Sequence, residues 1–137
     1  MFKRNLRLRK DRDFQKVYKN GGFLASDLFN LNFLLTKEPN TRIGIVISKK
    51  ILKKAFQRNK LKRRIREVLK NLYPRIKPGF DVIITVKKEA LAKSFAELEI
   101  ELFRQLQKKE LVKKDEKNIA KSDKNLPKND LSGPRSA

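Results

Sequence analysis

The sequence predicts a single domain of the α+β class, built from one sheet and several helices. Three stretches have the alternation or the density of branched apolar residues that is typical of strands: residues 28–35, 42–47 and 80–86. Two longer stretches, 55–72 and 94–109, repeat apolar residues at helical spacing. The chain of 137 residues is long enough for one well-filled core and too short for two.

The N-terminal part predicts an extended arm followed by a short helix. Residues 4–9 alternate basic and apolar side chains, as an extended chain does. Asp11 or Asp13 can cap the helix, and the glycines at 21 and 22 end it. The apolar side chains of this helix recur at helical spacing, at Phe14, Val17 and Tyr18. A short strand is predicted near residues 23–25.

The predicted strand 28–35 has two different faces. One face is apolar and points to a core, with Phe29, Leu31, Phe33 and Leu35. The opposite face carries Leu28, Asn30, Asn32 and Leu34. Because half of this second face is polar, we expect it to be open to a ligand.

The C-terminal half predicts two helices around the strand 80–86, and then a tail. Pro74 stops the long helix, and Ser94 with Glu97 has the spacing of a capping box that opens the last one. The last helix is expected to bury Phe95, Leu98, Leu102, Phe103 and Leu106. Beyond it, polar residues dominate without an apolar period. We therefore predict a folded domain over residues 1–111 and a disordered basic tail over residues 112–137.

The charge of the chain is large and unevenly distributed. The net charge is +21, and residues 49–77 hold 13 Lys or Arg against one acid, Glu67. Residues 78–111 are balanced, with six basic and six acidic side chains. Such a local positive field attracts polyanions, of which RNA and DNA are the usual ones. A membrane partner is not expected, because no apolar segment is long enough to enter a bilayer.

The residue types that are absent exclude several classes of enzyme. There is no Cys, which excludes a disulfide framework and thiolate metal sites. There is no His, which excludes Ser-His-Asp and Cys-His catalysis. A chain without Cys suits a reducing compartment, and the residues after Met1 do not form a signal-peptide pattern. We expect a cytoplasmic protein.

Residues 58–66 are the densest basic segment, with six cations in nine positions of the long helix. At about 100° per residue, Leu61, Ile65, Val68, Leu69 and Leu72 form an ordinary core stripe. Beside it lie Arg58, Asn59, Lys62, Arg63 and Arg66, whereas Lys60, Arg64 and Glu67 lie on the far side. Like charges at intervals of four residues repel, so this face favours an external anion over plain solvent. Asn59 adds a group that can donate to and accept from sugar or base edges.

This segment and three others resemble one family. The motif Arg58-Asn59-x-x-Lys62-Arg63-x-x-Arg66 resembles the signature of the protein subunit of bacterial ribonuclease P. Residues 42–50, which end in Ser-Lys-Lys, resemble its strand and the exit from that strand. Residues 13–18 and 94–98 resemble the starts of its first and last helices. Four blocks in order at fitting spacings are specific, and the resemblance covers about residues 4–109.

The resemblance implies a particular fold. The family forms an α-β sandwich of order αβββαβα around a mixed sheet. Its strands corresponding to 42–47 and 80–86 pair in parallel, and the helix between them makes a left-handed crossover. General physics favours the right-handed sense for such a connection, so the left-handed one is an expectation from the resemblance alone.

The resemblance also implies a function. The RNA subunit of this ribonuclease is the catalyst and cleaves the 5′ leader from precursor tRNA with bound Mg²⁺, so no catalytic or metal-binding residue is expected in the protein. The partners implied are the ribonuclease P RNA in a 1:1 complex, precursor tRNA, and other, 4.5S-like RNA substrates. The residues implied in binding the catalytic RNA are Arg58, Asn59, Lys62, Arg63, Arg66, Lys49, Lys50 and Lys54. The candidates for binding the leader are Phe14 and Tyr18, which can stack on unpaired bases, together with Asn30 and Asn32, whose polar face is expected in the same cleft. Arg7 and Arg9 are expected to reach phosphate from the arm.

Alternatives remain at this point. A ribosomal or other basic structural RNA-binding protein would also carry the basic helix. A protein-only nuclease would need clustered carboxylates for Mg²⁺, whereas the acids here are scattered. Phe14, Val17 and Tyr18 are also what a short helix needs in order to dock on a sheet. The family often has an aromatic residue where this chain has Asn32.

Overall fold

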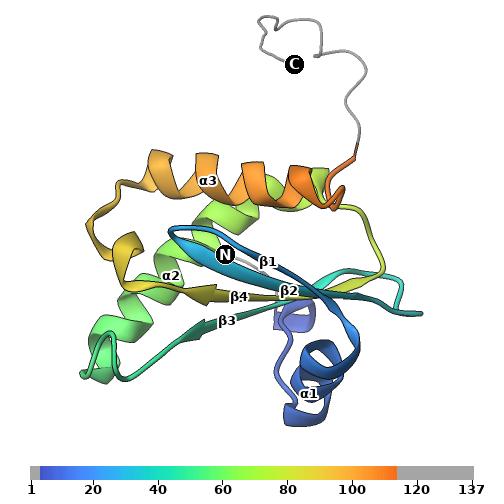
Figure 1. Ribbon diagram of the computed structural model, residues 1–137, viewed down its shortest axis with the longest axis horizontal. Helices are drawn as coiled ribbons and strands as arrows, with labels where there is room; N and C mark the ends of the chain where they lie inside the picture. The colour runs from blue at the N-terminus through green and yellow to red at the C-terminus, as the bar shows by residue number, and fades with distance from the viewer. Residues whose placement is uncertain (1–3, 114–137) are drawn as a thin grey trace, which may run out of the picture.

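The computed structural model describes residues 4–113, which form a four-stranded sheet with helices on both faces (Figure 1). The main elements in chain order are α1 (Asp11–Asn20), β1 (Gly22–Ala25), β2 (Phe29–Leu35), β3 (Arg42–Ile47), α2 (Ala55–Leu72), β4 (Phe80–Val86) and α3 (Phe95–Lys108). Short 3-10 helices add η1 (Arg4–Leu6), η2 (Tyr73–Arg75) and η3 (Lys88–Ala92). The predicted α+β class and the order αβββαβα are confirmed.

The sheet is mixed, with strand order β1-β2-β4-β3. β2 pairs antiparallel with β1 and β4, whereas β3 pairs in parallel with β4. α2 is therefore the crossover between two neighbouring parallel strands; the left-handed sense of this crossover stays a prediction. The N-terminal arm runs along β3, where Arg7 forms a bridge with Ile43 and the Leu8 N–H donates to the Ile43 carbonyl at 3.0 Å.

α2 and α3 cover one face of the sheet and enclose the main core. The sheet contributes alternate side chains of its two central strands, Phe29, Leu31, Val82, Ile84 and Val86. The helices contribute Leu61, Ile65, Val68, Leu69, Leu72, Leu98, Leu102 and Leu106. All of these side chains are buried. We call this the closed face of the sheet.

α1 and the arm cover only part of the opposite face, which we call the open face. A small cluster holds α1 there, with Leu8, Val17 and Ile83 buried and Phe14, Leu34 and Val46 packed around them. Figure 1 shows α1 on the side of the sheet away from α3. Leu28 was expected on this face and does not lie there. It precedes β2 and is buried in the main core.

One prediction about the last helix is confirmed and one needs correction. The capping box forms, since the Ser94 N–H donates to Glu97 Oε1 at 2.9 Å and the Glu97 N–H donates to Ser94 Oγ at 3.2 Å. Phe95 is not buried, because it stands at the solvent-facing start of α3. Gln105 takes a core position instead, and its Nε2 donates to the Phe29 carbonyl at 3.0 Å.

The predicted N-cap of α1 is also wrong, whereas Gly21 ends the helix as predicted. Lys10 is the N-cap and makes no side-chain cap hydrogen bond, while Asp11 and Asp13 lie within the first turn. Acids in a first turn still interact favourably with the helix dipole. Asp13 has a further partner, since its Oδ2 lies 3.5 Å from Nη1 of Arg42 on β3. Nε and Nη2 of Arg42 donate hydrogen bonds of 3.0 and 2.8 Å to the buried carboxylate of Asp81 on β4.

Contacts with the folded domain continue past residue 111, where the sequence predicted that the domain ends. Leu111 and Val112 are both buried, and Val112 forms an antiparallel bridge with Ile76. The Lys113 N–H donates to the Arg75 carbonyl at 2.7 Å. These contacts are made with the segment that follows α2, which local sequence does not reveal. The rest of the predicted tail, residues 114–137, lies outside the described residues.

Candidate nucleic-acid interface

α2 presents a row of cations beside its buried stripe. The stripe consists of the five apolar side chains that the sequence predicted. Next to it, Arg58, Lys62 and Arg66 follow one another at intervals of four residues and are half-buried; we call them the inner row. Asn59 and Arg63 are exposed further round the helix. Within residues 4–113, no acidic side chain forms an ion pair with the inner row.

The positive charges of Lys62 and Arg66 in the inner row are destabilised by their surroundings. Burial lowers the pKa of Lys62, and the nearby charges of Arg66 and Arg58 lower it further. Burial also lowers the pKa of Arg66, followed by the charges of Arg7 and Arg63. Both shifts mean that the charged forms are less stable here than in water. A polyanion against this row would offset both the burial and the repulsion.

Arg58 has a structural task in addition. Its Nη1 donates to the carbonyls of Leu52 and Lys53, each at 2.8 Å. These bonds fasten the β3–α2 loop to the first turns of α2. Arg58 therefore supports the loop whose lysines the sequence analysis assigned to RNA, and a change at Arg58 alters more than charge.

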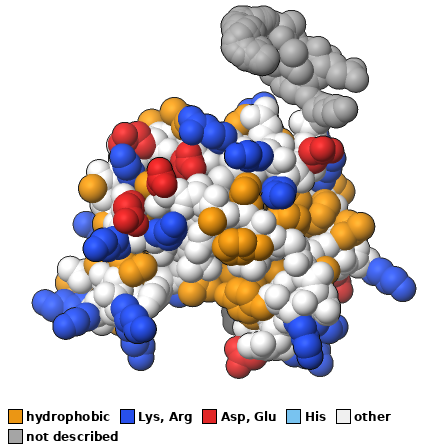
Figure 2. All heavy atoms as spheres, in the orientation of Figure 1, with side chains coloured by type: hydrophobic (Ala, Val, Ile, Leu, Met, Phe, Trp, Pro, Cys, Tyr) orange, Lys and Arg blue, Asp and Glu red, His pale blue; other side chains and the backbone are white. Residues whose placement is uncertain are grey.

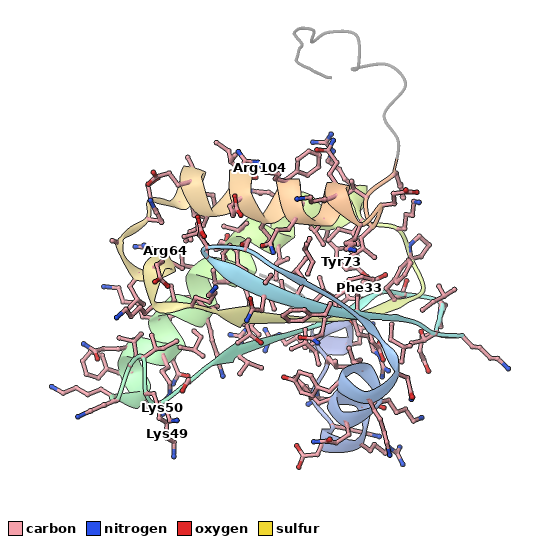
Figure 3. The ribbon with its side chains drawn as sticks, in the orientation of Figure 1. Phe33, Lys49, Lys50, Arg64, Tyr73 and Arg104 are labelled. Carbon is pink, nitrogen blue, oxygen red and sulfur yellow. The ribbon has the colours of Figure 1, made fainter. Side chains whose placement is uncertain are left out.

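The loop between β3 and α2 is the most exposed part of the basic surface. Lys49, Lys50 and Lys54 are all exposed. Figure 3 shows Lys49 and Lys50 projecting from this loop into solvent. In Figure 2, basic side chains gather over this loop and the start of α2, while acidic ones gather over the start of α3. At this corner of the molecule the basic side chains are not interspersed with acidic ones.

A groove at the edge of β3 joins the inner row to α1. It has a volume of about 280 Å³ and is lined by Arg7, Leu8, Arg9, Phe14, Ile43, Gly44, Ile45, Lys62 and Arg66. Gly44 makes this arrangement possible, because a Cβ there would lie 2.6 Å from Cζ of Phe14. The groove brings arm residues, an α1 aromatic ring and two cations of the inner row to one place.

Phe14 and Tyr18 lie one turn apart on α1, as predicted. Their ring centroids are 6.5 Å apart and the rings are tilted by 39°. Phe14 is half-buried and packs on the small cluster that holds α1 to the sheet, whereas Tyr18 is 46% exposed. Phe14 therefore helps to dock α1 on the sheet and also faces the groove. Tyr18 has an exposed ring that can stack on a base.

Asn30 and Asn32 lie on the open face, as predicted, and Phe23 joins them there. Asn32 pairs with Ile83 on one side and with Phe23 on the other. Phe23 is 55% exposed and brings to this face an aromatic ring that the sequence analysis missed. Oδ1 of Asn30 is buried and accepts no hydrogen bond within the described residues. An unsatisfied buried acceptor is costly, so it suits a ligand that donates.

The described part of the chain has neither a candidate metal site nor a candidate membrane span. Among residues 4–113, no three acidic side chains lie close enough to hold a metal ion. No helix in the same range is long and apolar enough to cross a membrane.

Comparison with known proteins identifies the family. The family model for Ribonuclease P matches residues 2–110, which is most of the chain. The chain belongs to the ribonuclease P protein family. The ribonuclease P protein component of Synechocystis sp. is 40% identical over 89 residues, covering 64% of this chain and 72% of that protein. That of Clostridioides difficile is 35% identical over 99 residues, covering 72% and 86%.

Solved structures of ribonuclease P proteins have the same fold. The protein from Staphylococcus aureus superimposes with a TM-score of 0.71 at 30% identity, covering 79% of this chain and 98% of that one. The protein from Thermotoga maritima has a TM-score of 0.68 at 32% identity, covering 74% and 96%. The resemblance seen in four sequence blocks is confirmed. The chain is the protein subunit of a ribonuclease P, the endoribonuclease of tRNA processing, and the ribonuclease P RNA is its partner.

Proposed function

We propose that this ribonuclease P protein holds the catalytic RNA with one surface and the 5′ leader of precursor tRNA with another. The inner row, with Asn59, Arg63 and the loop lysines, binds the ribonuclease P RNA in a 1:1 complex. The open face, with Phe14, Tyr18, Asn30 and Asn32, binds the unpaired leader, and Phe23 adds a further ring. Arg7 and Arg9 contact phosphate between the two. Cleavage is carried out by the RNA with its own Mg²⁺, in the cytoplasm.

The shared groove at the edge of β3 is the observation that carries this proposal. Phe14 lines it from α1, and Lys62 and Arg66 line it from α2. A strand that stacks over α1 and the open face therefore leaves the protein beside the cations that face the RNA subunit. Such an arrangement brings a substrate strand to the catalytic RNA, which a protein with a single structural RNA contact does not need. The same logic extends to 4.5S-like substrates with an unpaired 5′ segment.

Salt dependence tests the RNA-binding surface. Arg66→Ala should weaken binding to ribonuclease P RNA and reduce the slope of log K against log salt by about one unit. Lys108→Ala is the matched control, because Lys108 is an exposed cation at the end of α3. The control should leave affinity and slope unchanged. An unaltered slope for Arg66→Ala would mean that this side chain does not meet phosphate.

Leader length tests the second surface. Tyr18→Ala and Phe14→Ala should weaken binding of precursor tRNA by the assembled enzyme and spare binding of mature tRNA, because only the precursor has a leader. Loss of one stacking ring costs about 1–3 kcal/mol. Phe95→Ala, a half-exposed ring on α3, is the control. An equal loss of affinity for both RNAs would contradict leader binding. A lowered melting temperature of Phe14→Ala would show how much of its effect comes from the docking of α1 on the sheet.

The division of labour has its own test. Purified protein without RNA should not cleave precursor tRNA at any Mg²⁺ concentration, because its acids are dispersed. Cleavage by RNA-free protein would overturn the assignment of the chemistry to the RNA subunit.

A further inference from the structure

α2 carries a second row of side chains that the proposed function does not use. Phe56, Lys60 and Arg64 follow one another at intervals of four residues, about 6 Å apart along the helix axis. We call them the outer row. At 100° per residue, Phe56 at the start of this row lies about 160° round the helix from Arg58 at the start of the inner row. The buried stripe therefore separates the two rows on one side, and solvent separates them on the other.

The outer row lines a groove of its own. This groove has a volume of about 270 Å³ and is lined by Phe56, Gln57, Lys60, Leu61, Arg64 and Leu91. It shares no residue with the groove at the edge of β3. Leu91 comes from η3, and in Figure 3 Arg64 extends to the side where η3 runs. The floor is apolar and the rim is cationic.

Phe56 contributes little to the fold. The residue is 65% exposed, although α2 has a well-filled buried stripe close by. Nζ of Lys54 lies 6.0 Å from the centroid of the Phe56 ring. The side chains of Lys60 and Arg64 are exposed and make no hydrogen bond or ion pair within residues 4–113. Glu67, the acid nearest in sequence, forms no ion pair with either of them.

An accessible ring among unpaired cations suits an unpaired nucleotide. The base stacks on the ring whatever its identity, and the phosphates meet the cations. The occupant is indicated by continuity, because Asn59 and Arg63 extend the basic surface from the inner row round the solvent side of α2. One RNA can therefore contact both rows. A protein partner would have to bring an acidic surface into a field that the proposed RNA already fills.

We infer that the outer row binds an unpaired nucleotide of the ribonuclease P RNA. The base stacks on Phe56 and its phosphate lies against Lys60 and Arg64. This inference rests on the proposed function, since it takes the same RNA as the occupant. It adds a base-stacking contact to a surface whose other members contact phosphate, sugar or base edges.

Substitutions of Phe56 separate stacking from simple apolar contact. Phe56→Ala in the full-length protein should weaken binding to ribonuclease P RNA by about tenfold without changing the salt slope. Phe56→Tyr should bind as the wild type does, whereas Phe56→Leu should lose as much as Phe56→Ala. Ile100→Ala, which removes an apolar residue of similar exposure on α3, should change nothing. A Phe56→Leu variant that binds like the wild type would overturn the stacking contact.

Two further measurements complete the test. Arg64→Ala should reduce the salt slope by about one unit. A photoreactive benzoylphenylalanine in place of Phe56 should crosslink to an unpaired nucleotide of the RNA; a crosslink to paired nucleotides only would overturn the inference. Wild-type affinity of the Phe56 variants combined with weakened binding of Arg66→Ala would overturn this inference and leave the proposed function standing. If Arg66→Ala also binds with wild-type affinity, both this inference and the proposed RNA-binding surface would be overturned.

Discussion

The two faces of the sheet differ in how completely helices cover them. On the closed face, α2 and α3 bury Phe29, Leu31, Val82, Ile84 and Val86 of the central strands, and Ile84 and Leu98 have no exposed surface. On the open face, α1 covers Ile83 but leaves Phe23, Asn30 and Asn32 at least partly exposed. A sheet buried on one face already has its core, so the other face can keep polar and aromatic side chains for a ligand. We therefore expect stability to depend on the closed face and substrate binding on the open one.

The largest effect should come from a cavity in the closed face. Ile84→Ala removes a fully buried side chain at the centre of the sheet and should lower the free energy of unfolding by about 2–5 kcal/mol. Asn32→Ala on the open face should change it by no more than about 0.5 kcal/mol. Urea denaturation of the two variants measures both. Similar losses of unfolding free energy in the two variants would show that both faces of the sheet contribute equally to stability.

A smaller effect is expected where the open face is tied to α1. Asp81→Ala leaves the Arg42 guanidinium without its two short hydrogen bonds and should lower the free energy of unfolding by about 1–3 kcal/mol. Asp13→Ala should cost less than about 1 kcal/mol, because that pair is longer and more exposed. Chemical denaturation should rank the two variants in this order. The reverse order would make α1, and not β4, the main partner of Arg42.

Phe23 should separate binding from stability. Phe23→Ala removes a ring that is 55% exposed, so the free energy of unfolding should change by about 0.5 kcal/mol or less. Affinity for precursor tRNA should nevertheless fall about fivefold, the lower end of what one stacked base contributes. Leu35→Ala is the control, since Leu35 is 68% exposed at the far end of β2. Loss of stability without loss of affinity would assign Phe23 to the fold.

The smallest effect concerns pH and the cap of α3. Hydrogen bonds from the Ser94 backbone and side chain lower the pKa of Glu97 below its ordinary value. A carboxylate with a lowered pKa stabilises the fold above its unfolded pKa, and this contribution disappears as pH falls through the folded pKa. Glu97→Gln keeps the box but cannot titrate. The difference in urea midpoint between the two proteins should therefore be present at neutral pH and vanish in acid; a constant difference would contradict it.

Local patterns predicted much of the basic interface and missed what depends on pairing. The inner row and the buried stripe of α2 follow from helical periodicity, which needs only residues three and four apart. Phe23 escaped notice because β1 is four residues long, and only its register with β2 places that ring beside Asn32. The groove that joins Phe14 to Lys62 and Arg66 depends on the arm lying along β3, a contact across some 35 positions of sequence.

The sequence by itself determined the bounds of α2, β3 and β4, the capping box of α3 and the concentration of charge in residues 49–77, since each depends on neighbouring residues. The resemblance to ribonuclease P proteins also lay in the sequence. Only the tertiary structure decided that Val112 belongs to the core, that Gln105 bonds to the Phe29 carbonyl, and that Arg58 supports its own loop. These contacts join segments that periodicity cannot relate, and they form because buried polar groups and apolar surface must find partners wherever the folded chain supplies them.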